Sequence, residues 1–215
     1  FLFISAFLDF YVFSAAKYAI DARLNNAASG YFNLIFMPTS VIYMVANFII
    51  RPFLTKLTNM WLARDFDSFK KELSRIGVVI LGLTVLAVGA TAVLGRWVLS
   101  VMEFLLGVRY DGMLVQYHGA FIVIVLGGGF YALANLMYYS LVIMRKQKAI
   151  FIVYLSAAAA AVLLSGTLVS SFGINGAASC YLLLMVMLVV GFGLFMTGVY
   201  QNEKKEYAGN GGSEE

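Results

Sequence analysis

The sequence predicts an all-α protein built as a polytopic bundle of about six membrane-spanning helices. Of its 215 residues, 62% are hydrophobic and 12% are charged, and the mean hydropathy is +0.88. A soluble domain is roughly half apolar and about a quarter charged. The excess of apolar side chains therefore has to face hydrocarbon. Two further observations predict a bilayer as the solvent: the length of the apolar segments and the placement of the basic residues.

Six apolar segments come close to the roughly 20 residues that an α-helix needs to cross a bilayer. We therefore expect residues 1–200 to form one transmembrane bundle. In chain order, the expected spanning segments are 1–20, 31–53, 76–99, 119–144, 149–170 and 174–200.

Basic residues gather in every second connection between these segments. Because short basic loops remain in the cytoplasm, the alternation predicts six crossings of the plasma membrane, with both ends of the segment cytoplasmic. The net charge of +4 is then a feature of topology, and no nucleic-acid partner is expected. The basic connections contain Lys56, Arg64, Lys70, Lys71 and Arg75, then Arg145, Lys146 and Lys148, then Lys204 and Lys205; the others contain only Arg23, Arg96 and Arg109.

Two segments outside the expected spans have their own patterns. In 62–76, apolar residues recur at alternating spacings of four and three, which is typical of an amphipathic helix. It is either a helix on the inner membrane surface or an extension of the neighbouring helices. Residues 201–215 are polar and are expected to form a disordered cytoplasmic tail.

The sequence lacks a constellation typical of an enzyme, and neither a metal nor a cofactor is expected. His118 is the only histidine, and Cys180, the only cysteine, lies in an apolar run. The run Gly127-Gly128-Gly129 lacks the Gly-Lys-Ser/Thr ending of a phosphate loop. Within a spanning helix, three glycines indicate a bend or a close contact between helices.

Charged residues inside the first segment are the strongest functional signal. A charge at the centre of a spanning helix costs roughly 2.5–3.5 kcal/mol and usually faces a cavity or a partner. Asp9 lies near the middle of the segment, and its short carboxylate cannot reach an interface, so it is expected to face a cavity. Lys17 either faces a cavity or extends to the outer interface with Asp21 as its partner.

The second and fourth segments add further polar candidates. Asn47 and Arg51 lie one turn apart near the inner end of the second segment. Arg51 is either an anchor at the cytoplasmic boundary or part of an anion site, because a guanidinium binds phosphate well. Pro38 removes a backbone hydrogen bond and should kink the helix. Asn135 either contributes to the cavity or hydrogen-bonds a neighbouring helix.

Several motifs together carry a family resemblance. They are Lys17-Tyr18-Ala19-Ile20-Asp21; Tyr31-Phe32 with Phe36-Met37-Pro38; Arg51-Pro52-Phe53-Leu54-Thr55-Lys56-Leu57; Tyr138-Tyr139 with Met144-Arg145-Lys146-Gln147-Lys148; and Gly173-Ile174-Asn175-Gly176-Ala177-Ala178. The chain resembles the second half of bacterial polysaccharide flippases of the multidrug/oligosaccharidyl-lipid/polysaccharide exporter superfamily. It departs from the family at Ser14-Ala15-Ala16, where Asn-Ala-Pro is frequent, so the first helix is expected to be less kinked.

The resemblance implies two pseudo-symmetric six-helix bundles around a central cavity that works by alternating access. The chain begins inside an apolar stretch, so we expect it to be the C-terminal half, with an N-terminal bundle as its partner. The implied activity moves an undecaprenyl-diphosphate-linked oligosaccharide from the inner to the outer leaflet for polysaccharide or lipopolysaccharide biosynthesis. A polysaccharide polymerase and glycosyltransferases are possible partners.

The resemblance also implies roles for the polar candidates. Lys17 and Arg51 would supply positive charge to the substrate cavity, with Asn47 and Asn135 as further candidates. Asp9 would couple transport to a proton or sodium gradient.

Three alternatives remain open. A cation-coupled drug or metabolite antiporter of the same superfamily would have an acidic, aromatic-lined cavity. A membrane-embedded transferase would need clusters of His, Asp or Arg in long outer loops, whereas the outer loops here are short. A scaffold for polysaccharide synthesis would have no need of a buried Asp9.

Overall fold

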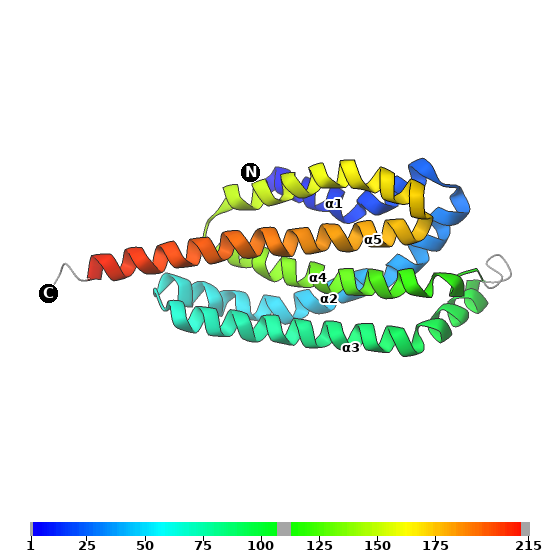
Figure 1. The fold of residues 1–215 in the computed structure, drawn as a ribbon. Coiled ribbons are helices and arrows are strands. Elements are labelled where there is room, and N and C mark those ends of the chain that lie inside the picture. Colours follow the sequence, from blue (N-terminus) through cyan, green and yellow to red (C-terminus); the bar gives the residue numbers. More distant parts are fainter. Residues whose placement is uncertain (1, 107–112, 212–215) are drawn as a thin grey trace.

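A computed structural model describes residues 2–106 and 113–211, and these residues are almost entirely helical (Figure 1). Local signals set the helix starts. The side chain of Asn25 accepts a hydrogen bond from the backbone N–H of Ala28, and Asp65 does the same for Ser68. The elements are α1 (Leu2–Arg23), α2 (Asn26–Leu62), α3 (Phe66–Leu106), the short 3₁₀ helix η1 (Val115–Tyr117), α4 (His118–Ile143) and α5 (Gln147–Gly211).

Helix α5 consists of two arms that meet at Gly173. This glycine has non-helical backbone angles (φ 57°, ψ −132°), which suit a residue without a Cβ atom. Figure 1 shows the two arms side by side, with the second arm extending beyond the other helices. The arms approach closely at Gly176, where a Cβ atom would lie 2.0 Å from the Leu168 carbonyl oxygen. The expected segments 149–170 and 174–200 thus lie on the two separate arms of α5.

Within residues 2–106 and 113–211, five helices are long and apolar enough to cross a membrane, which is consistent with a multi-pass membrane protein. Large apolar side chains are exposed along their outer faces, among them Phe7, Val85 and Leu163. In water such surface would be unfavourable, whereas in a bilayer it is solvated by lipid. At 1.5 Å per residue, the 37 residues of α2 and the 41 of α3 are much longer than a spanning segment needs, so their ends reach beyond the hydrocarbon.

The three consecutive glycines bring α4 into close contact with three other helices. A Cβ atom at Gly127 would lie 2.7 Å from the ring of Tyr181 in α5, and one at Gly128 would lie 3.1 Å from Ile42 in α2. At Gly129 a Cβ atom would lie 2.0 Å from Cγ2 of Thr84 in α3. The prediction of close helix contacts at this run is confirmed, and α4 is the central helix of the bundle.

The structure decides two points outside the expected spans. Residues 66–76 form the first three turns of α3, so 62–76 is no separate surface helix, and of the two interpretations the helical extension is correct. Its apolar side chains pack inward, with Phe66, Phe69 and Ile76 buried. The tail prediction is wrong for residues 201–211, which continue α5 as a helix, and residues 212–215 lie outside the described part of the chain.

The two turns that connect α2 to α3 and α4 to α5 have the same backbone design. Arg64 and Arg145 have positive φ angles of 58° and 57°. In each turn, the residue with positive φ donates its N–H to the carbonyl three residues earlier, and the next residue donates to the carbonyl five residues earlier. This is the pattern of a Schellman motif, which ends a helix sharply. Both turns lie at the end of the bundle where the two chain ends also lie, here called the basic end (Figure 1).

Candidate functional site

Asp9 lies inside the bundle, where tyrosine hydroxyls from two other helices reach its carboxylate. The hydroxyl of Tyr131 on α4 lies 3.2 Å and 3.1 Å from the two carboxylate oxygens and donates to them. Tyr154, on the first arm of α5, also interacts with this carboxylate. Both tyrosines are buried. Asp9 is partly buried, and its carboxylate faces side chains of other helices, whereas the cavity expected at Asp9 stays a prediction.

A third tyrosine completes this group, which we call the Asp9 cluster (Asp9, Tyr131, Tyr154 and Tyr181). Tyr181 is fully buried, and its hydroxyl has no hydrogen-bond partner among the described residues. It is close enough to Asp9 to interact with it electrostatically. A buried hydroxyl without a partner is unfavourable by about 1–3 kcal/mol. The cluster thus contains one buried hydroxyl, that of Tyr181, that has no partner among the described residues and does not reach the Asp9 carboxylate.

Asn47 and Asn135, two separate candidates from the sequence, meet in the structure. Asn47 is 6% exposed, and its side-chain oxygen accepts hydrogen bonds from Asn135 Nδ2 at 3.3 Å and from the Tyr139 hydroxyl at 3.4 Å. Its amide nitrogen donates to the Tyr43 carbonyl at 2.9 Å. Both of its polar atoms are satisfied within the protein, so these contacts hold α2 against α4.

The two groups are joined along one face of α4. Tyr131, Asn135 and Tyr139 follow one another at intervals of four residues, which places them on one side of the helix. Tyr43 of α2 stacks on Tyr131 with ring centroids 5.4 Å apart. A polar stripe therefore extends about 12 Å from the Asp9 cluster toward the basic end of the bundle.

Lys17 is placed on an aromatic ring. It is half-buried, and its ammonium lies 4.6 Å from the ring centroid of Phe36 on α2, a cation–π geometry. Asp21, the partner considered from the sequence, accepts a hydrogen bond from the Ser29 hydroxyl. Lys17 and the Asp9 cluster share a neighbourhood, because Phe13 packs against both Phe36 and Tyr131.

Arg51 and Pro38 lie outside this polar group. The Arg51 side chain is exposed, and within 2–106 and 113–211 it forms no hydrogen bond or ion pair. The geometry leaves both the anchor and the anion-site interpretations available. Helix α2 continues through Pro38 without interruption, and Pro38 borders an apolar cavity between α2, α3 and α4.

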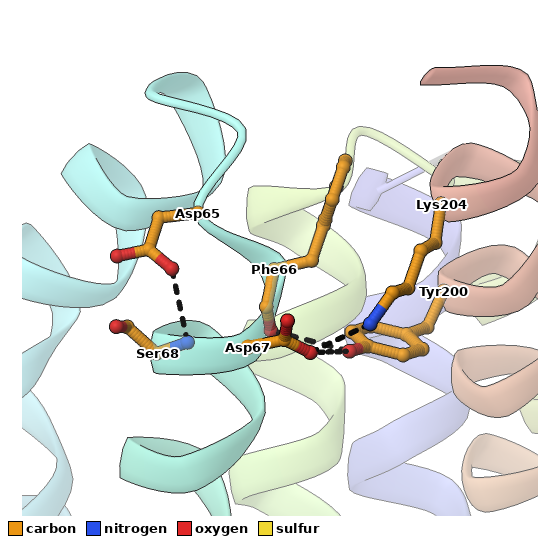
Figure 2. Close-up of polar contacts among 6 residues, drawn as sticks. All are labelled: Asp65, Phe66, Asp67, Ser68, Tyr200 and Lys204. Carbon is orange, nitrogen blue, oxygen red and sulfur yellow. Dashed lines mark hydrogen bonds and ion pairs between the residues drawn. The ribbon is translucent and has the colours of Figure 1, made fainter. Parts of the chain in front are cut away.

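Charged side chains at the basic end connect the α2–α3 turn, the α4–α5 turn and the last part of α5. The sequence analysis predicts all three on one side of the membrane. Glu203 of α5 pairs with Arg64 at 2.9 Å and with Lys146 at 3.3 Å. Figure 2 shows Lys204 and Tyr200 of α5 reaching the Asp67 carboxylate at the start of α3, with a Lys204–Asp67 distance of 2.6 Å. These contacts fix the end of α5 against the two Schellman turns.

The Lys204–Asp67 pair lies outside the expected spanning segments 76–99 and 174–200, and both side chains are exposed. The hydrogen bond from Lys204, reinforced by its charge, lowers the pKa of the Asp67 carboxyl. In turn, the hydrogen bond to Asp67 raises the pKa of Lys204. Both groups therefore keep their charges over a wider pH range than either would alone.

Sequence reasoning identified Asp9 but missed its tyrosine partners. Thirteen tyrosines are spread over the chain, and most of them resemble ordinary interfacial or core residues. The one available signal was the four-residue spacing of Tyr131, Asn135 and Tyr139, which indicates a polar face on an otherwise apolar helix.

Comparison of the chain with protein-family models, with curated proteins and with solved structures finds no match.

Proposed function

We propose that the chain is half of an ion-coupled flippase that moves an undecaprenyl-diphosphate-linked oligosaccharide from the inner to the outer leaflet of the plasma membrane. Transport would proceed by alternating access between this bundle and an N-terminal bundle. The motif resemblance supports the substrate class. The observation that carries the proposal is the Asp9 cluster, a partly buried carboxylate that accepts hydrogen bonds from the Tyr131 hydroxyl within a bundle whose outer faces are apolar.

The chemistry of the Asp9 cluster suits a small cation. Carboxylate and hydroxyl oxygens are hard ligands that bind a proton or a sodium ion. Ionisable groups within spanning helices typically mark ion pathways or proton relays. The Tyr131 hydroxyl offers a further oxygen at the same place. Binding of a cation would balance the carboxylate charge.

The polar stripe on α4 supports the same proposal. Tyr131, Asn135 and Tyr139 provide hydrogen-bonding groups between the Asp9 cluster and the basic end. An ion released toward the cytoplasm would need polar groups along its way, because crossing bare hydrocarbon is strongly unfavourable. The stripe supplies them on the cytoplasmic side of Asp9.

Two cations are available for the diphosphate. The Lys17 ammonium lies over an aromatic ring, and Arg51 is exposed without a partner in the described part of the chain. A guanidinium can hold a phosphate through two parallel hydrogen bonds, whereas an ammonium acts as a compact point charge. The lipid tail would remain in the bilayer.

The proposed topology has six crossings, with each arm of α5 crossing once and the basic end in the cytoplasm. Ten Lys and Arg side chains belong to the segments that meet at this end, against two described at the other. Such an excess is what the positive-inside rule requires of short cytoplasmic connections. A polysaccharide polymerase and glycosyltransferases would act on the same lipid-linked intermediate.

The experiment is complementation of polysaccharide export by variants of the intact protein in cells that lack it. We expect Asp9→Asn and Lys17→Ala to reduce export at unchanged membrane abundance. Glu206→Gln and Lys205→Ala change the same charges at exposed positions of the last helix and should export normally. Normal export by Asp9→Asn would remove the coupling role, and normal export by Lys17→Ala would remove Lys17 from the substrate cavity.

A cation-coupled drug or metabolite antiporter is a second candidate, favoured by the aromatic surroundings of Asp9. Phe13 and Tyr43 both pack against Tyr131, whose hydroxyl contacts the carboxylate, and aromatic rings of this kind attract an organic cation. This alternative predicts that Asp9→Asn sensitises cells to lipophilic cations while polysaccharide export is unaffected. The flippase proposal predicts the reverse.

A further inference from the structure

An apolar crevice lies between α2 and α3, with α4 as its floor. One part has a volume of about 200 Å³, and an adjoining part has about 430 Å³. Val41, Ile42, Ala87 and Val125 border both parts, so the two are continuous. Figure 1 shows α2 and α3 running alongside each other over this stretch.

The crevice is lined by small residues on all three helices. Ala46 of α2, Ala87 of α3 and Gly129 and Ala132 of α4 line the first part. At its rim, Val41 is 59% exposed, so the crevice opens sideways toward the membrane. Apolar cavities of this kind stay free of water. In a bilayer, hydrocarbon is therefore the occupant that fits.

A surplus of positive charge lies at the basic end of the same helix pair. Lys56 of α2 pairs with the buried Glu72 of α3 at 2.8 Å. Lys71 and Arg75 act electrostatically on the same carboxylate, and both are exposed. Glu72 thus matches the charge of Lys56, while Lys71 and Arg75, which flank Glu72 along α3, add two exposed positive charges at the same end for an anion from outside the chain.

The separation between crevice and cations matches the layers of a membrane lipid. Ile49 borders the crevice on α2, and Lys56 follows seven residues later, about 10 Å along the axis. On α3, Ile80 borders the crevice and Arg75 precedes it by five residues, about 7 Å. The polar headgroup region extends roughly 5–8 Å beyond the hydrocarbon on each side of a bilayer.

We propose that the α2–α3 seam binds one anionic phospholipid, with its phosphate at Lys56, Lys71 and Arg75 and one acyl chain in the crevice. Basic pockets between spanning helices recognise anionic headgroups through their charge. The uncompensated cations favour an anionic lipid over a zwitterionic one, while the crevice favours a lipid with an acyl chain long enough to fill it. In the proposed orientation this lipid belongs to the cytoplasmic leaflet, and its site is separate from the Asp9 cluster.

The test is native mass spectrometry of the intact, detergent-solubilised protein titrated with phosphatidylglycerol or with phosphatidylcholine of the same chains. We expect tighter binding of phosphatidylglycerol. Each cation near the membrane surface contributes a factor of about five, so Lys71→Gln with Arg75→Gln should weaken that binding roughly 25-fold. The matched control, Lys148→Gln with Lys205→Gln, removes the same charge from the same end and should bind normally.

Binding of the acyl chain in the crevice is tested by separate experiments. Ala87→Leu fills the crevice and should weaken binding of both lipids. Phosphatidylglycerol with six-carbon chains should bind the wild-type protein poorly, which tests the crevice without altering the fold. Equal affinity for the two headgroups, equal loss in the control variant, or undiminished binding of the short-chain lipid would overturn the proposal. Displacement by equimolar polyprenyl diphosphate would also overturn it and assign the seam to the transported lipid.

Discussion

Replacing Gly129 by alanine tests the central position of α4. The added Cβ atom would lie 2.0 Å from Cγ2, 2.4 Å from Oγ1 and 2.8 Å from Cβ of Thr84. Because all three atoms are too close, no rotation of the Thr84 side chain relieves the overlap, and α3 must move away from α4. Overpacking of a well-packed core typically costs about 1–3 kcal/mol. We expect the melting temperature of purified protein to fall by about 2–12 °C.

The matched control for this variant is Gly82→Ala on α3. A Cβ atom at Gly82 meets nothing within 4 Å, so the substitution gives only the gain in helix propensity, about 1 kcal/mol. Thermal unfolding in detergent, followed by tryptophan fluorescence, should rank Gly82→Ala at or above wild type and Gly129→Ala clearly below it. If Gly129→Ala melts at or above the wild-type temperature, the close contact between α3 and α4 does not exist.

Three further predictions concern other parts of the bundle. Tyr181→Phe removes a buried hydroxyl without a partner, so the melting temperature in ion-free buffer should stay equal or rise, whereas Tyr131→Phe should lower it; a clear fall for Tyr181→Phe would show that its hydroxyl is bonded. The pKa of Asp67 is lowered, so its pairing with Lys204 is lost only below the pH range in which an aspartate usually titrates. Asp67→Asn should therefore change the stability equally at pH 5 and pH 8, and a change at pH 8 alone would contradict this. In a Cys180→Ala background, an impermeant maleimide applied to whole cells should label Ser171→Cys and spare Lys148→Cys; the opposite result would invert the topology.

The helical architecture could be predicted from the sequence because lipid imposes simple rules. A segment must be apolar over about 20 residues, and basic connections stay on one side. The structure confirms an all-helical chain with long apolar helices. The extension of α3 to Phe66 was harder to predict, because an amphipathic pattern has the same period on a membrane surface as in an extended helix.

The candidate site could be predicted only in part. Asp9 was evident because a charge in a spanning segment is costly, and Asn47 and Asn135 because amides there need partners. Tyr154 and Tyr181 could not be assigned to Asp9, since their approach depends on how the two arms of α5 pack against α1. The arrangement of these two arms depends on the direction of the turn at Gly173, which the sequence spacing alone does not determine.

The coupling role of Asp9 is tested most directly by transport in vesicles. The intact protein, reconstituted with a lipid-linked oligosaccharide, is subjected to an imposed proton or sodium gradient, and translocation is followed by protection of the sugar from an external glycosidase. We predict that one of these gradients accelerates translocation by the wild-type protein and by Glu206→Gln, and that neither gradient affects Asp9→Asn. Equal acceleration of Asp9→Asn would contradict the assignment of ion coupling to this carboxylate.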